Sequence, residues 1–197
     1  MIDNKAQIFI DFINKYVFLT NDEEALLLSK ISHRKYLKGQ YVVQQGDVCK
    51  NSGFVISGCT RTFYVDDEGQ EHIVMFSIED WWASEIGSFV SQSPSDYNVQ
   101  CIEETHLIQL SFDDQEDLFK EIPKLERFFR LILEQAFVAS QKRIISNFSL
   151  SAKEQYINFK KQYPKIEQRI PQYMVASYLG ISKEFLSRIK KQLISEL

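Results

Sequence analysis

The stretch PQYMVASYLGISKEFLSRIKKQL, residues 171–193, has the pattern of two short helices joined by a tight turn. Val175, Ala176 and Leu179 give the first helix an apolar face. Gly180 follows, at a point where a helix can end in the left-handed conformation that glycine adopts at little cost. Ser182 suits the N-cap of the second helix, because its hydroxyl can accept from a backbone N–H. The pattern predicts a helix-turn-helix, a motif that places its second helix in the major groove of DNA.

The second helix divides into an apolar face and a polar face. Leu186, Ile189 and Leu193 recur at helical spacing. The residues that we predict to contact DNA follow the other side: Ser182, Lys183, Glu184, Ser187, Arg188 and Lys191. An ordinary helical hairpin at the end of a domain would also have a polar outer face. The charge of the region is therefore needed to distinguish a DNA-binding motif from such a hairpin.

Positive charge is concentrated at the C-terminal end of the chain. Residues 152–197 contain nine Lys/Arg against four Asp/Glu, whereas residues 1–151 contain 14 against 23. The formal net charge of −4 therefore hides a basic end. Phosphate contacts supply most of the non-specific affinity of proteins for DNA, so this distribution favours the DNA-binding interpretation.

Composition excludes several other classes of protein. No apolar run approaches the roughly 18 residues that a membrane span needs, and the first residues do not have the pattern of a secretory signal, so we expect a cytoplasmic protein without a membrane partner. Cys49, Cys59 and Cys101 are scattered, which predicts buried reduced thiols. We find no catalytic constellation and no metal-ligand spacing, and so expect neither an enzyme nor a bound cofactor.

The first part of the chain predicts two helices followed by an all-β region. Apolar spacing is helical over residues 5–32, and Thr20 to Glu23 has the capping pattern that opens a second helix. Turn signals then recur at intervals of about ten residues, which indicates a sandwich or barrel. The expected strands are 34–37, 41–43, 53–56, 59–65, 71–76, 98–102 and 104–111. Ser111 is expected to cap a short helix that reaches about Lys120.

A long helix is predicted from Pro123 to about residue 147. Apolar spacing at positions 125, 129, 132, 136, 139 and 143 suits a seam between two helices, which predicts a homodimer. Packing of this helix on the chain's own β region is the alternative. Residues 147–151 break the pattern, so we expect a β-region domain over 1–122, a dimerisation helix over 123–147 and a helix-turn-helix domain over 148–197.

This order of elements resembles the CRP/FNR family of bacterial transcription regulators over essentially the full length. The matching motifs are Gly46-Asp47, FVISG at 54–58, EDWWASE at 79–85 and SKEFLSRIKKQL at 182–193. The resemblance implies an α+β fold: an N-terminal double-stranded β-roll of the cyclic-nucleotide-binding type, a long dimerisation helix and a C-terminal winged-helix-like helix-turn-helix domain. It implies a dimeric regulator that binds double-stranded DNA, with RNA polymerase and a small-molecule effector as further candidate partners. By the same match, Lys183, Glu184 and Arg188 would contact base edges.

The candidate effector pocket departs from the cyclic-AMP-binding members of the family. Glu85 matches the family's ribose-binding glutamate, although a purely structural carboxylate is the alternative. Ser95 and Asp96 stand where those members carry Arg-Ser, and Ser140 on the long helix completes the predicted pocket. Because no Lys or Arg lies between positions 62 and 119, a cyclic phosphate would lack its counter-charge. We therefore expect an effector other than cyclic AMP.

Three alternatives stay open at this point. The pocket could be filled by the chain's own aromatic side chains, namely Trp81, Trp82, Phe89 and Tyr97. The protein could instead be a small-molecule-binding signalling module whose helical end contacts another protein. The sequence ends at Leu197 without the β-hairpin wing of many relatives, which implies either fewer contacts to the DNA backbone or a shortened sequence.

Overall fold

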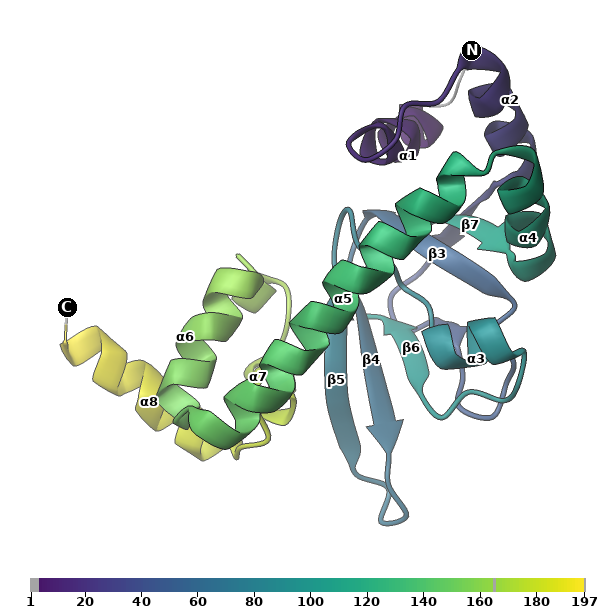
Figure 1. Ribbon diagram of the computed structural model, residues 1–197. Coiled ribbons are helices and arrows are strands. Elements are labelled where there is room, and N and C mark those ends of the chain that lie inside the picture. The colour runs from purple at the N-terminus through teal and green to yellow at the C-terminus, as the bar shows by residue number, and fades with distance from the viewer. Residues whose placement is uncertain (1–3, 165, 197) are drawn as a thin grey trace. The chain divides into compact units, whose positions relative to one another are not determined.

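The computed structural model describes residues 4–164 and 166–196 (Figure 1). By their contacts these residues form two compact units. The first, called the roll unit below, comprises the residues up to Tyr64 together with Met75–Gln135. The second, the C-terminal unit, comprises Val65–Val74 and the residues from Ala136 onward. The prediction divided the chain into consecutive domains, whereas the structure includes the short segment Val65–Val74 in the C-terminal unit.

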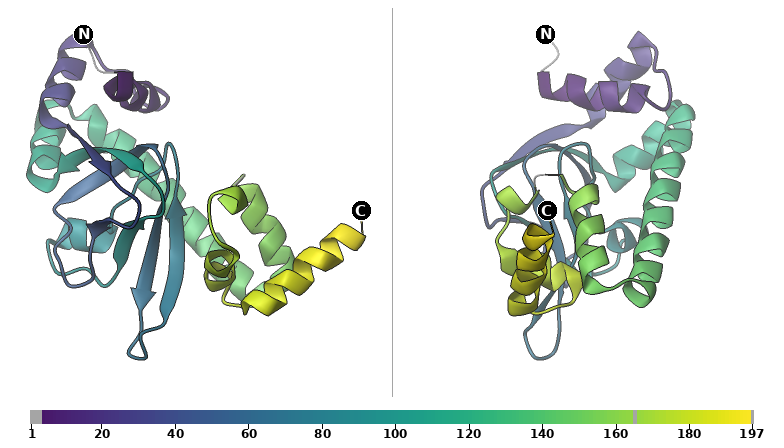
Figure 2. Two further views of the ribbon diagram at one scale, coloured as in Figure 1. Left: turned by 180° about the vertical axis from the view of Figure 1, so that it is seen from behind. Right: turned by 90° about the vertical axis from the view of Figure 1, so that its left-hand side faces the viewer.

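Seven strands form two antiparallel sheets, as the turn spacing predicted. The first sheet has the order β1-β7-β3, with bounds Ser32–Tyr36, Thr105–Ser111 and Asn51–Ser57. The second has the order β2-β6-β4-β5, with bounds Tyr41–Val43, Asn98–Cys101, Thr60–Val65 and Glu71–Ser77. Figure 2 shows from two further sides that the β4–β5 hairpin runs on beyond its neighbours. Every predicted strand is present, with bounds that differ from the prediction by at most two residues.

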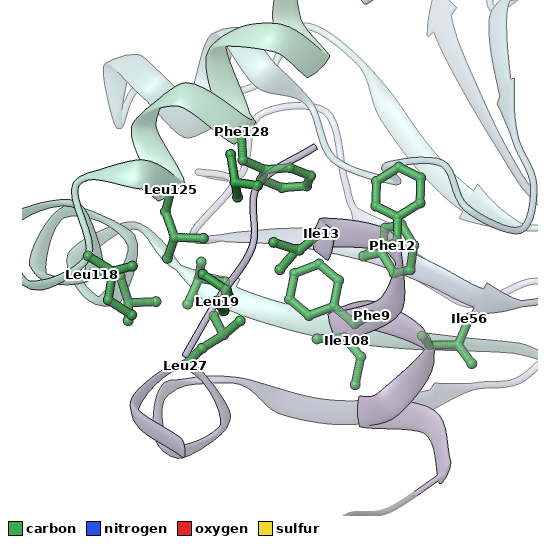
Figure 3. Close-up of a cluster of buried hydrophobic side chains, with 14 residues drawn as sticks. Phe9, Phe12, Ile13, Leu19, Leu27, Ile56, Ile108, Leu118, Leu125 and Phe128 are labelled. Atoms are coloured by element: carbon green, nitrogen blue, oxygen red, sulfur yellow. The ribbon is translucent and has the colours of Figure 1, made fainter. Parts of the chain in front are cut away.

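One face of the first sheet is covered by helices. They are α1 (Asn4–Asn14), α2 (Asn21–Lys30), α4 (Phe112–Glu121) and the start of α5 (Lys124–Ser149). Thr20 and Glu23 form the predicted capping box of α2, and Ser111 caps α4 by accepting from the Asp114 N–H at 3.1 Å. Phe9 and Phe12 of α1 meet Phe54 of β3 at ring-centroid distances of 5.1 and 4.8 Å. These side chains belong to a buried cluster that also takes in Leu118, Leu125 and Phe128 (Figure 3).

The opposite face of each strand points into the interior of the roll. Successive side chains alternate across a strand, so Val55 and Leu107 point inward while Phe54 and Ile108 point to the helices. A second buried cluster fills the interior: Tyr36, Val43, Cys49, Val55, Ala83, Phe89, Val99, Cys101 and Leu107. All three cysteines are buried thiols, as predicted.

Gly58 makes the turn between β3 and β4 possible. Its φ is +107°, and a Cβ at this position would lie 2.6 Å from the backbone of Thr105. An L-residue would be strained in that conformation and would also clash, so glycine is required here.

The long helix α5 is present, but its exposed apolar row is not the predicted one. Leu125 is buried in the core, Phe129 and Ile132 pack against the core, and Arg143 is half-buried. The predicted seam was therefore wrong in its choice of face, because its first half is covered by the chain's own core. The exposed apolar side chains lie on other faces of the helix: Leu133, Phe137, Val138, Ile144, Ile145 and Phe148.

The C-terminal unit is mainly helical after α5. It contains α6 (Ala152–Gln162), the short 3-10 helix η1 (Ile166–Gln168), α7 (Gln172–Leu179) and α8 (Lys183–Ser195). Helix α5 continues through Ser149, two residues beyond its predicted end, and Ser151 with Glu154 forms a capping box that starts α6. None of the described helices combines the length and the apolar character that crossing a bilayer requires.

Candidate nucleic-acid interface

Helices α7 and α8 form the predicted helix-turn-helix. Gly180 ends α7 with φ at 67°, the left-handed conformation, and its N–H donates to the carbonyls of Ala176 and Ser177. The Ile181 N–H also returns to the Ala176 carbonyl, at 3.0 Å. Ser182 caps α8 by accepting from the Phe185 N–H at 3.1 Å. Each residue singled out for the turn therefore performs the predicted role.

A compact core decides which face of α8 points outward. Val175 and Ala176 of α7 are buried, as are Leu186 and Ile189 of α8. The same unit buries five further large side chains: Tyr156, Phe159, Tyr163, Ile166 and Ile170. Because α8 turns its apolar side to this core, its polar side is left at the surface.

The six residues predicted to contact DNA lie on the outward side of α8. Ser182, Lys183, Glu184, Arg188 and Lys191 are exposed, and Ser187 is half-buried. Within residues 4–164 and 166–196, the side chains of Lys183, Glu184 and Lys191 form no hydrogen bond or ion pair. Their donors and acceptors are therefore available to a ligand.

A partly buried polar network holds α8 against the rest of the unit. The Glu167 carboxylate accepts from the Tyr156 hydroxyl at 2.7 and 2.9 Å and from the Lys190 ammonium at 2.9 Å. Burial raises the pKa of Tyr156 above its usual range, and the adjacent carboxylate raises it further, so the phenol stays a donor. Lys190 thus joins α8 to η1 and α6, and it is a structural cation on the inner side of the helix.

Phe185 is a surface residue that the sequence analysis missed. It is 40% exposed although it is a large aromatic, and the Arg188 guanidinium lies 5.2 Å from its ring centroid. The sequence did contain a signal for this exposure. Phe185 lies in the first turn of the helix, beside Glu184, and outside the apolar stripe of Leu186, Ile189 and Leu193.

Two of the four candidate effector residues, Glu85 and Ser95, bond to the chain's own backbone. Glu85 is the N-cap of α3 (Ile86–Ser91), and its carboxylate accepts from the N–H groups of Gly87 at 2.8 Å and Ser88 at 2.7 Å. The buried Ser95 hydroxyl donates to the Tyr97 carbonyl at 2.8 Å. Asp96 is exposed in the roll unit, and Ser140 is exposed on the part of α5 that belongs to the C-terminal unit. The structure thus gives Glu85 a structural role, and the four-residue effector pocket stays a prediction.

The aromatic residues expected to fill the pocket have different positions. Phe89 lies in the interior cluster, with its ring 5.7 Å from that of Phe112. Trp82 packs instead among the helices, with ring-centroid distances of 6.0 Å to Phe9 and 5.3 Å to Phe129. Thr60 and Thr62 pair with Cys101 and Val99, which lie in the interior cluster, and their buried hydroxyls have no hydrogen-bond partner among the described residues. Trp82 Nε1 and Gln115 Oε1 are likewise buried without a partner among the described residues, and the sequence analysis singled out neither the two hydroxyls nor these atoms.

Comparison with known proteins shows what the chain is similar to. Residues 33–121 match the sequence profile of the cyclic nucleotide-binding domain. The transcriptional activator protein Anr of Pseudomonas aeruginosa is 24% identical over 169 residues, which cover 79% of this chain and 68% of Anr. FnrA of Stutzerimonas stutzeri is 25% identical over the same shares. A CRP/FNR regulator structure from Eubacterium rectale superposes with a TM-score of 0.70 at 17% identity, over 98% of this chain and 89% of that one. The chain is thus similar in sequence to Anr and FnrA, and it shares the fold of CRP/FNR regulators.

A second solved structure has a similar fold. The c-di-GMP responsive regulator CLP of Xanthomonas campestris superposes with a TM-score of 0.72 at 16% identity, over 90% of this chain and 93% of CLP. In the present chain, residues 62–119 contain fourteen Asp/Glu and no Lys or Arg.

Proposed function

We propose that the protein is a dimeric, DNA-binding transcription regulator that reads its target with α8. The observation that carries the proposal is the exposed polar face of α8, which includes Lys183, Glu184 and Arg188. The side chains of Lys183 and Glu184 have no partner among the described residues. The relatives Anr and FnrA bear the names of transcriptional activators. As a regulator of DNA it would work in the cytoplasm, with RNA polymerase as a further partner.

The side chains on α8 supply complementary readout of base edges. Arg188 and Lys183 can donate to guanine O6 and N7, and Glu184 can accept from cytosine N4. Phe185, at the edge of this surface, offers an apolar contact to a thymine methyl group. Ser182 at the helix N-terminus is suited to a phosphate oxygen, and Lys191 and Ser187 add polar contacts along the helix.

Pairing of two chains through α5 is the second part of the proposal. Phe137 and Phe148 are 64% and 88% exposed on this helix, together with four exposed aliphatic residues. Such a row of apolar side chains is typical of an interface. A two-fold dimer would present two α8 helices to half-sites about 34–36 Å apart, one turn of the duplex.

We further propose that cyclic AMP is not the effector. Glu85 already occupies the N–H groups of Gly87 and Ser88, and no cationic side chain of residues 62–119 could balance a phosphate. A cyclic phosphate would have to displace a carboxylate while meeting other acidic groups, which is unfavourable. The unpartnered hydroxyls of Thr60 and Thr62 suit a small uncharged ligand instead. Titration calorimetry that shows micromolar binding of cyclic AMP would contradict this part.

Selection from random duplexes at low salt tests the central proposal. We expect enrichment of a near-palindromic site, and we expect Arg188→Ala to weaken binding to that site by about 1–3 kcal/mol while binding to random DNA changes little. Arg130→Ala is the matched control, because Arg130 is also exposed but pairs with Glu134 on the roll side of α5. If no sequence is enriched and binding shows no dependence on salt, the helical end contacts protein and not DNA.

A further inference from the structure

The end of the β4–β5 hairpin belongs to the same compact unit as the helix-turn-helix. Strand β5 is the edge of its sheet, and an edge strand presents backbone groups that need partners. The Ser177 hydroxyl of α7 accepts from the Ile73 N–H at 3.1 Å and donates to the Glu71 carbonyl at 3.0 Å. One side chain thus satisfies two alternate residues of the edge, as a neighbouring strand would.

Arg143 of α5 adds a second link to the same place. Its guanidinium donates to the Val74 carbonyl of β5 and to the Tyr178 carbonyl of α7, the latter at 3.3 Å. It also lies 4.1 Å from the centroid of the Tyr178 ring. A guanidinium is planar and carries five N–H donors, so it can hold two carbonyls and stack on a ring at once, which a lysine cannot do. Arg143 therefore joins β5, α5 and α7.

These contacts reach α8 through the packing of the motif. Val175 and Ala176 of α7 are buried, as are Leu186 and Ile189 of α8, and the turn between the helices is fixed by Gly180. Whatever holds α7 consequently holds α8. The polar face of α8 remains exposed with the hairpin in place, so the hairpin does not compete for the surface that would read DNA.

We propose that Arg143 and Ser177 are positioning residues for DNA reading, which seat the helix-turn-helix on the hairpin end and fix its angle to α5. This inference rests on the proposed function. Neither residue contacts bases. Their effect is on the distance between the two α8 helices of a dimer, so they set which spacing of half-sites is accepted.

The test compares matched serine variants on a series of DNA sites. Ser177→Ala removes both hydrogen bonds to β5, and Ser177→Thr keeps a hydroxyl. Ser149→Ala is the control, because the Ser149 hydroxyl donates to the Ile145 carbonyl of its own helix. Each full-length protein is titrated with the selected site and with sites whose half-site spacing is changed by one or two base pairs. Amide hydrogen exchange of Ile73 is measured in parallel.

For Ser177→Ala, we expect the ratio of its affinity for the selected spacing to its affinity for the altered spacings to fall about tenfold. Its affinity for a single half-site should stay unchanged. Exchange of the Ile73 amide should become about tenfold faster. Ser177→Thr and Ser149→Ala should behave as the unaltered protein. Arg143→Lys keeps the positive charge but loses the planar guanidinium with its several donors. We expect it to lose the spacing preference as well, and it provides a second folded variant.

Two results would overturn the inference in different ways. If the unaltered protein binds no DNA, the proposed function and the positioning role fail together. If it binds, but Ser177→Ala and Arg143→Lys keep the full spacing preference, only the positioning role fails. A loss of half-site affinity equal to the loss at the full site would also contradict it, since that result assigns these residues to general stability.

Discussion

Replacing Phe148 with serine is expected to separate the dimer while leaving each chain folded. Phe148 is 88% exposed on α5, so the isolated chain gains almost nothing from it. Burying a Phe side chain contributes about 1.5–3 kcal/mol. A two-fold interface contains the residue twice, so the loss on dimerisation is about 3–6 kcal/mol. The dissociation constant of the dimer should rise roughly 150- to 20,000-fold.

Sedimentation velocity over a range of protein concentrations measures this change directly. Phe18→Ser is the matched control, because the Phe18 side chain is 78% exposed and lies between α1 and α2; its carbonyl accepts from Lys124 at the start of α5, outside the exposed apolar residues of that helix. We expect the control to sediment as the unaltered protein and to retain cooperative binding to a palindromic site. The reasoning is refuted if Phe148→Ser dimerises as strongly as the control, or if both variants unfold at a clearly lower temperature.

Three further predictions follow from individual side chains. Phe185→Ala should lose sensitivity to replacement of thymine by uracil in the selected site, whereas the unaltered protein should bind the uracil site several-fold more weakly, since only the methyl group differs. The hydrogen bond from Ser111 and the ammonium of Lys30 lower the pKa of Asp114, so its stabilising effect is present above about pH 4 and is lost as pH falls through that lowered value. Asp114→Asn should therefore lower the melting temperature at pH 7 but not at about pH 2, and an equal loss at both would contradict the assignment. Burial raises the pKa of Cys101 to about 11, so iodoacetamide at about pH 8 should label this thiol only after denaturant is added; rapid labelling of the native protein would argue against its burial.

Local chemistry made much of the fold predictable from sequence. Gly58 and Gly180 occupy turns with positive φ, and Thr20, Ser111 and Ser182 cap helices where the pattern placed them. The spacing of turn signals predicted all seven strands, with bounds within two residues of those observed. These features depend on neighbours within a few positions, so a single sequence contains the information for them.

The outward face of α8 was predictable for the same reason. Leu186 and Ile189 had to be covered, so Lys183, Glu184 and Arg188 on the other side had to be exposed. Phe185 escaped notice because an aromatic residue is expected to be buried, and only the packing of the unit shows that it is partly exposed.

Only the tertiary structure decided which contacts α5, Glu85 and the β4–β5 hairpin make. Helix α5 is apolar on more than one side, so its sequence could not tell which row the core covers; Leu125 and Phe128 are covered, and Phe137 and Phe148 are not. Glu85 carries the motif of a ligand-binding residue, yet its carboxylate closes back on the start of α3. Residues 65–74 lie about a hundred positions from α7 along the chain, and their contact with Ser177 arises from the fold as a whole. The sequence by itself determined the elements and the polar face of α8, because those are set by near neighbours, whereas the partners of each face depend on segments that only folding brings together.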